Sequence, residues 1–147
     1  KLQEKISHFL SGKGFQEILT NSLTNQKYEN DLKLGKNKVV KIMNHSSDAL
    51  DILKPTPLYT ALESIRFNLN RKQESLKLFE FSKTYARKNS QLIETNNLCL
   101  FRVGNKQEAS WMEQTAPVTF HHLFGDVEDL IQKKCIYAFC NTSKKLS

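Results

Sequence analysis

The sequence has 147 residues, 39% of them hydrophobic, and its 22 Lys and Arg against 15 Asp and Glu give a net charge of +7. This size and balance suit one ordinary globular domain with a single core. No apolar run approaches the roughly 18 residues of a membrane-spanning helix, and the N-terminus lacks the apolar core of a secretory signal. We therefore expect a cytoplasmic protein with no membrane partner. The positive charge favours polyanions such as RNA without identifying one.

The first half of the sequence predicts a helix, a turn, a strand and a loop, in that order. Apolar residues recur at helical spacing over residues 1–10, and Gly12 and Gly14 then supply stop signals. Residues 15–20 follow as a short strand, and Ser22 or Thr24 is placed to cap a short helix. Residues 39–43, rich in β-branched side chains, predict a second strand that ends before Asn44.

The second half predicts two more helices around a strand pair. Pro57 can begin a helix whose apolar face is Leu58, Leu62, Ile65 and Leu69. Apolar residues on both faces of residues 76–85 indicate a central strand, and residues 97–103 suit an antiparallel neighbour. A further helix is expected over residues 119–134, capped by Thr119. The fold class is therefore α+β, with an antiparallel sheet flanked by helices.

Neither metal nor catalytic residues stand out. The adjacent His121 and His122 point about 100° apart on a helix, so they cannot easily share one ion. Residues 12–14, Gly-Lys-Gly, lack the length and the following Ser or Thr of a phosphate-binding loop. Cys99, Cys135 and Cys140 form no Cys-x-x-Cys pair, which favours buried, reduced thiols. We predict no catalytic, cofactor-binding or metal-binding residues in this chain.

The order of several short motifs resembles the synthetase-like core of the β subunit of bacterial phenylalanyl-tRNA synthetase. The matching segments, in chain order, are Gly14-Phe15-Gln16-Glu17-Ile18, a strand ending in Asn44, Leu53-Lys54, Asn70-Arg71 at the end of a Leu-rich helix, Leu78-Phe79-Glu80, and a helix from Phe120 to Leu130. Three positions depart from the family pattern: His45 replaces Pro, Lys54 replaces Arg and Ser82 replaces Gly. The resemblance covers nearly the whole chain and implies a single class II synthetase-like module over residues 1–147, a fragment of a longer β subunit.

That module resembles a class II aminoacyl-tRNA synthetase catalytic domain without its chemistry. Such a site needs an Arg followed closely by a carboxylate on one strand, to hold the α-phosphate of the adenylate, and another Arg in a Gly-rich segment. Ala86 occupies the expected Arg position, and the five glycines, at positions 12, 14, 35, 104 and 125, form no cluster. The resemblance therefore implies an inactive chain within a phenylalanine–tRNA ligase, where ATP and Mg²⁺ act at the partner subunit's site.

Two sets of residues are candidate contacts. The resemblance implies an (αβ)₂ heterotetramer with the α-subunit interface near residues 44–69, and the candidates are Asn44, Leu58, Leu62, Glu63 and Arg66. An alternative is equally open: the apolar side chains Leu58, Leu62, Ile65 and Leu69 of this helix all face inward, so we keep both interpretations as predictions. The candidate RNA contacts are the basic residues Arg71, Lys72, Arg87 and Lys88, although a solvated charged face explains them as economically.

Three functions follow from the sequence. The first is a noncatalytic module that supports assembly with the α subunit and the charging of tRNA(Phe) by the assembled ligase. The second is an active class II synthetase domain, disfavoured by the missing Arg and Gly-rich elements. The third is an independent basic RNA-binding module, supported by charge alone.

Overall fold

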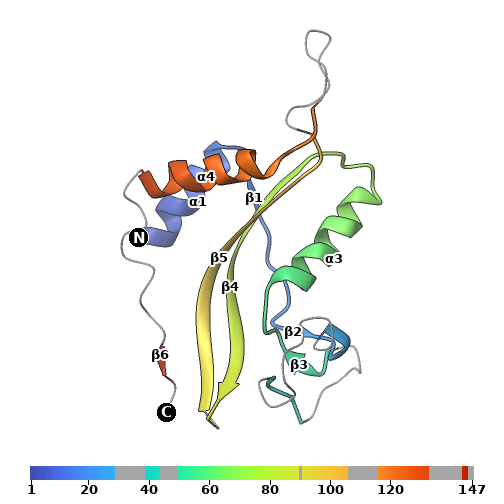
Figure 1. Ribbon diagram of the computed structural model, residues 1–147, viewed down its shortest axis with the longest axis vertical. Coiled ribbons are helices and arrows are strands. Elements are labelled where there is room, and N and C mark those ends of the chain that lie inside the picture. The colour runs from blue at the N-terminus through green and yellow to red at the C-terminus, as the bar shows by residue number, and fades with distance from the viewer. Residues whose placement is uncertain (29–38, 44–49, 90, 106–115, 133–143, 146–147) are drawn as a thin grey trace. The chain divides into compact units, whose positions relative to one another are not determined.

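The computed structural model describes residues 1–28, 39–43, 50–89, 91–105, 116–132 and 144–145. The chain divides into two compact units. Unit 1 holds residues 1–18, 64–80 and 99–141, and unit 2 holds residues 19–63, 81–98 and 142–147. Three long elements run from one unit into the other: helix α3 (Leu58–Leu69) and the paired strands β4 (Leu76–Lys88) and β5 (Gln91–Val103) (Figure 1). The expectation of a single module over residues 1–147 stays a prediction.

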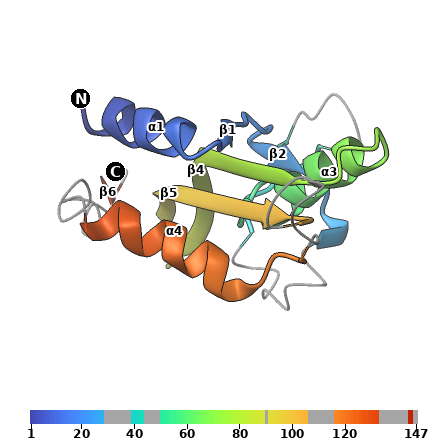
Figure 2. The same ribbon diagram turned by 90° about the horizontal axis from the view of Figure 1, so that it is seen from above.

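Unit 1 packs helices against one end of a sheet. Helix α1 (Leu2–Gly12) leads into β1 (Gln16–Glu17), which pairs in parallel with β4, Gln16 beside Leu78 and Glu17 beside Phe79. Helix α4 (Phe120–Gln132) returns to α1, and Figure 2 shows both helices beside the strands. The apolar side chains of this unit that are most fully buried belong to α1, the following turn, β4 and α4: Ile6, Leu10, Phe15, Leu78, Phe79 and Leu130.

Unit 2 contains a small second sheet. Strand β2 (Leu23–Thr24) pairs antiparallel with β3 (Ile52–Leu53), and Lys41 forms a single bridge to Ile52. The distal parts of β4 and β5 also belong to this unit, and β6 (Lys144–Lys145) pairs antiparallel with β5 at Ile93 and Glu94.

The predicted class is confirmed, with one addition to the sheet. The elements form an α+β fold whose main sheet has the order β1-β4-β5-β6. The sheet is mixed rather than purely antiparallel, because β1 runs parallel to β4. The helices α1, α3 and α4 lie within two residues of the predicted boundaries. The first seven residues of β4 include buried side chains on both faces, as expected for a central strand.

Two local predictions were wrong. Thr24 lies in strand β2 and is buried, so it caps no helix; instead the side-chain oxygen of Asn25 accepts a 2.8 Å hydrogen bond from the Lys27 N–H. The predicted strand over residues 39–43 is reduced to the bridge at Lys41, flanked by two backbone hydrogen bonds to residues 51 and 53. Asn44, Cys135 and Cys140 lie outside the described residues.

Only part of the apolar face of α3 is buried. Of the four predicted apolar residues only Ile65 is buried, at 6% exposure, whereas Leu58, Leu62 and Leu69 are 43%, 47% and 42% exposed. The small residues Thr60 and Ala61 are buried instead. A helix turns by about 100° per residue, so the three leucines lie within about 40° of one another, Ile65 and Ala61 follow on one side of them, and Thr60 lies further round on that same side.

Candidate interaction surfaces

The candidate subunit interface on α3 is an exposed apolar stripe with a polar border. We call Leu58, Leu62 and Leu69 the α3 stripe. They follow one another at intervals of four and seven residues, which keeps them on one side of the helix. The candidate residues Glu63 and Arg66 are also exposed and lie on the neighbouring part of the helix surface. The structure thus brings four of the five candidates onto one helix, and the fifth, Asn44, is not described.

An aromatic pair adjoins this surface in unit 2. The rings of Tyr28 and Tyr59 stack with centroids 4.3 Å apart and planes inclined by 10°. The Tyr28 hydroxyl donates a hydrogen bond to the carboxylate of Glu63, and the Lys27 ammonium lies 4.8 Å from the Tyr28 ring centroid. Glu63 is therefore already held by a neighbour, whereas the leucines of the α3 stripe present bare apolar surface.

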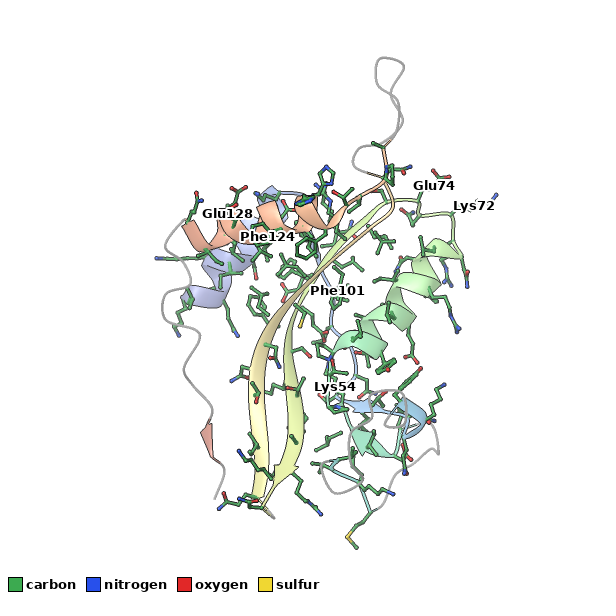
Figure 3. The ribbon with its side chains drawn as sticks, viewed as in Figure 1. Lys54, Lys72, Glu74, Phe101, Phe124 and Glu128 are labelled. Carbon is green, nitrogen blue, oxygen red and sulfur yellow. The ribbon has the colours of Figure 1, made fainter. Side chains whose placement is uncertain are left out.

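The four candidate RNA contacts fall into two pairs, one in each unit. Arg71 and Lys72 follow the end of α3, where Lys72 adopts a positive φ of 64° (Figure 3). The guanidinium of Arg71 lies 3.3 Å from the centroid of the Phe67 ring, and its Nη1 donates to the Phe67 carbonyl at 3.4 Å. A cation at a helix C-terminus also complements the helix dipole, so Arg71 has a structural role that needs no ligand.

The second pair, Arg87 and Lys88, ends strand β4. Both side chains are exposed, and Asn89 makes the turn toward β5 with a positive φ of 49°, which Asn tolerates better than most residues. No ion pair engages either cation within the part of the chain that the structure describes.

Lys54 lies at the centre of unit 2, a position that the sequence did not reveal. Its side chain is only 1% exposed, and Nζ donates to the hydroxyl of Thr20 at 2.9 Å (Figure 3). Thr20 in turn donates to the Thr60 hydroxyl at 3.0 Å, and Thr60 donates to the Pro57 carbonyl at 3.1 Å. Backbone bonds fix the same residue, because its N–H donates to Ser22 and its carbonyl accepts from Tyr85. This chain of hydroxyls lets an ammonium stay buried where the family pattern has Arg.

A second polar network ties together the helices and sheet of unit 1. Arg102 of β5 donates to Asp126 of α4 at 2.8 Å, and both side chains are largely buried. Lys13, at the end of α1, bonds the carboxylates of Asp126 and Asp129. Burial alone would lower the pKa of Lys13, but the hydrogen bonds and charges of the two aspartates outweigh it, and the pKa is raised. The network thus has a structural role.

The positions that would carry synthetase chemistry hold unsuitable groups. Ala86, at the expected place of the phosphate-binding Arg, presents only an exposed methyl group. Gly104 has a φ of +94°, and its α-carbon lies close to the Glu74 carbonyl. The glycine therefore serves a tight turn rather than a phosphate-binding loop. His122 accepts a hydrogen bond from the Thr119 N–H at 3.1 Å, as the Glu of a capping box does.

Within the described ranges no group of three His, Cys, Asp or Glu side chains is arranged to hold a metal ion, and no helix could cross a membrane.

Solved structures show which class of fold this is. An ATP phosphoribosyltransferase regulatory subunit/histidyl-tRNA synthetase from Bacillus halodurans matches 90% of this chain and 31% of its own, with a TM-score of 0.64 at 14% identity. A pyrrolysyl-tRNA synthetase from Desulfitobacterium hafniense matches 91% of this chain and 45% of its own, with a TM-score of 0.60 at 19% identity. The fold is that of a class II aminoacyl-tRNA synthetase core.

Sequence comparison narrows the class to one family. The chain belongs to the phenylalanyl-tRNA synthetase β chain CLM domain family, whose profile matches residues 1–145. The phenylalanine–tRNA ligase β subunit of Bacteroides thetaiotaomicron is 34% identical over 143 residues, and that of Porphyromonas gingivalis is 33% identical over 141 residues. The chain spans 17% of the length of each of these relatives. The predicted resemblance is confirmed.

Proposed function

We propose that this chain is a noncatalytic class II-like module that supports assembly of a phenylalanine–tRNA ligase by contacting the α subunit through α3. The observation that carries the proposal is the α3 stripe, three leucines of one helix that are each more than two-fifths exposed. An apolar stripe bordered by charged residues is typical of a protein–protein contact, because burying it removes apolar surface from water.

The charged residues beside the stripe should influence the rate of association more than the affinity. Glu63 and Arg66 flank the stripe and are exposed, so they would lie at the rim of a contact centred on Leu62. Rim charges mainly change the rate of association and its dependence on salt, whereas the central apolar residues carry most of the affinity. Leu62 is therefore the residue whose replacement should weaken α-subunit binding most.

The experiment is a sedimentation or pull-down assay with the purified α subunit. We expect Leu62→Glu to abolish co-sedimentation, while Glu63→Lys and Arg66→Glu weaken it and change its salt dependence. Arg87→Glu, near the end of β4, is the control with the same kind of charge change elsewhere. Undiminished binding by all three α3 variants would move the interface to another surface.

Catalysis would then belong to the partner. A ligase assembled in this way would use ATP and Mg²⁺ at the α subunit's site and would bind tRNA(Phe) as a complex, in the cytoplasm. The isolated chain should give no phenylalanine-dependent ATP–pyrophosphate exchange, because Ala86 offers no cation to the α-phosphate. Exchange by the pure chain would instead support the active-synthetase alternative.

A further inference from the structure

The distal half of the β4–β5 hairpin leaves the core of the protein. We call Lys83–Lys88 of β4 and Gln91–Asn97 of β5 the distal ribbon, all of it within unit 2. Burial along β4 stops after Ser82, and Lys83, Ala86, Arg87 and Lys88 are exposed. A two-stranded ribbon by itself is marginally stable, and β6 adds a third strand beside Ile93 and Glu94 of β5. Here the Tyr85 N–H donates to the Lys54 carbonyl at 3.1 Å and anchors the strand.

The charge of the distal ribbon is positive and uncompensated at its tip. Its only acidic residue is Glu94. The Lys83 ammonium forms a 2.8 Å ion pair with the Glu94 carboxylate, and the hydrogen bond between them raises the pKa of Lys83. Glu94 is thereby committed to Lys83, which leaves the charges of Arg87 and Lys88 available to an external anion.

Alternation along β4 places an aromatic ring between two cations. Successive side chains of a strand point to opposite faces, so Lys83, Tyr85 and Arg87 share one face, at intervals of about 7 Å. Tyr85 is half-buried, which holds the ring in place while leaving part of it accessible. On the other face Asn97 donates to Thr84 at 2.9 Å and ties the two strands together. Cations that follow a backbone, with an aromatic platform among them, are how proteins bind single-stranded nucleic acid.

We propose that the distal ribbon binds a single strand of RNA that crosses its tip, with phosphates at Arg87 on one face and Lys88 on the other and a base stacked on Tyr85. This activity is separate from α-subunit assembly and does not depend on it. The other basic pair, Arg71 and Lys72, suits the role less well, since Arg71 already stacks on Phe67 and caps the end of α3. A solvated charged surface with no ligand is the alternative that the experiment must exclude.

The test is fluorescence anisotropy of the full chain with a fluorescein-labelled oligouridylate of about 12 nucleotides, titrated at several salt concentrations. The ribbon variant is Arg87→Gln with Lys88→Gln, and the matched control is Arg71→Gln with Lys72→Gln. Both variants remove two positive charges and lower the net charge from +7 to +5. A third variant, Tyr85→Thr, removes the ring and keeps a β-branched residue in the strand. Far-UV circular dichroism shows that each variant is folded.

The phosphate and stacking contacts predict different results. Loss of two phosphate contacts should lower the slope of log Kd against log salt by about 1.4 and weaken binding at least about tenfold, while the control stays within about twofold. Tyr85→Thr should weaken binding about tenfold with an unchanged salt slope, since stacking releases no counterions. Equal losses in the ribbon and control pairs would show that net charge alone binds RNA. Failure of the unaltered chain to bind, or full affinity in Tyr85→Thr, would also overturn the proposal.

Discussion

Phe79 and Leu62 should differ sharply in their contribution to stability. The Phe79 side chain is 0% exposed in the middle of β4, and truncation of such a Phe to Ala costs about 3–5 kcal/mol in transfer and cavity energy. Leu62 is 47% exposed, so its truncation forfeits about half of the 1.5–3 kcal/mol of a fully buried Leu and opens no closed cavity. We expect about 1 kcal/mol for Leu62→Ala and a gap of at least 2 kcal/mol between the variants.

Urea unfolding followed by far-UV circular dichroism measures both values, and an unchanged m-value shows that the comparison is between like transitions. A domain of this size has roughly 5–15 kcal/mol of stability in total, so Phe79→Ala can consume much of it. If that variant does not fold, Phe79→Leu provides a milder test, at about 1–1.5 kcal/mol. A cost above about 2 kcal/mol for Leu62→Ala would refute the assignment of Leu62 to an exposed flank. The outcome also decides whether Leu62 variants report on binding without unfolding the chain.

Three further substitutions test the local structure. Gly104→Ala should cost about 2–3 kcal/mol, because its Cβ would overlap a backbone carbonyl oxygen, whereas Gly14→Ala, with a similar φ but open space, should cost about 1–2 kcal/mol in chemical denaturation. Asp126→Asn should cost about 2–3 kcal/mol and lower Tm by roughly 5–10 °C in calorimetry, since it withdraws the carboxylate from the largely buried Arg102. Lys54→Ala should cost about 2–4 kcal/mol in the same scan, because it leaves a cavity in the centre of unit 2.

Local patterns in the sequence predicted the long elements because those elements depend on nearby residues. The helices α1, α3 and α4 follow from apolar spacing, and β4 follows from apolar residues on both of its faces. Hydrophobicity alone left open whether the four apolar side chains of α3 pack inward, and of these only Ile65 is buried. Thr60 is buried since its hydroxyl finds two partners, the Thr20 hydroxyl and the Pro57 carbonyl, and a satisfied hydroxyl costs little inside. The 40 residues between Thr20 and Thr60 hide that pairing from any local pattern.

The polar networks were missed for the same reason. Lys13 and Asp126 are 113 positions apart, and Lys54 and Thr20 are 34 apart. Each of these residues has the sequence surroundings of an ordinary surface position or turn. Only the folded chain brings the partners together, so their burial becomes visible with the tertiary structure. The same limit applies to the distal ribbon, where Glu94 neutralises Lys83 across two strands and leaves the tip charged.

The partly exposed apolar face of α3 has a counterpart in α4, and both faces bear on the proposed assembly. The sequence of α4 places Leu123, Val127, Leu130 and Ile131 on one helical face, with Phe120 one turn upstream. Leu130 is buried, but Phe120, Phe124 and Ile131 are 74%, 52% and 45% exposed. Both helices therefore keep one buried side and one bare apolar flank. Stability of the chain alone does not explain the flanks, since exposed Phe and Leu add little to folding. In the assembly proposed above, a partner would cover these flanks, and burying them would remove their apolar surface from water.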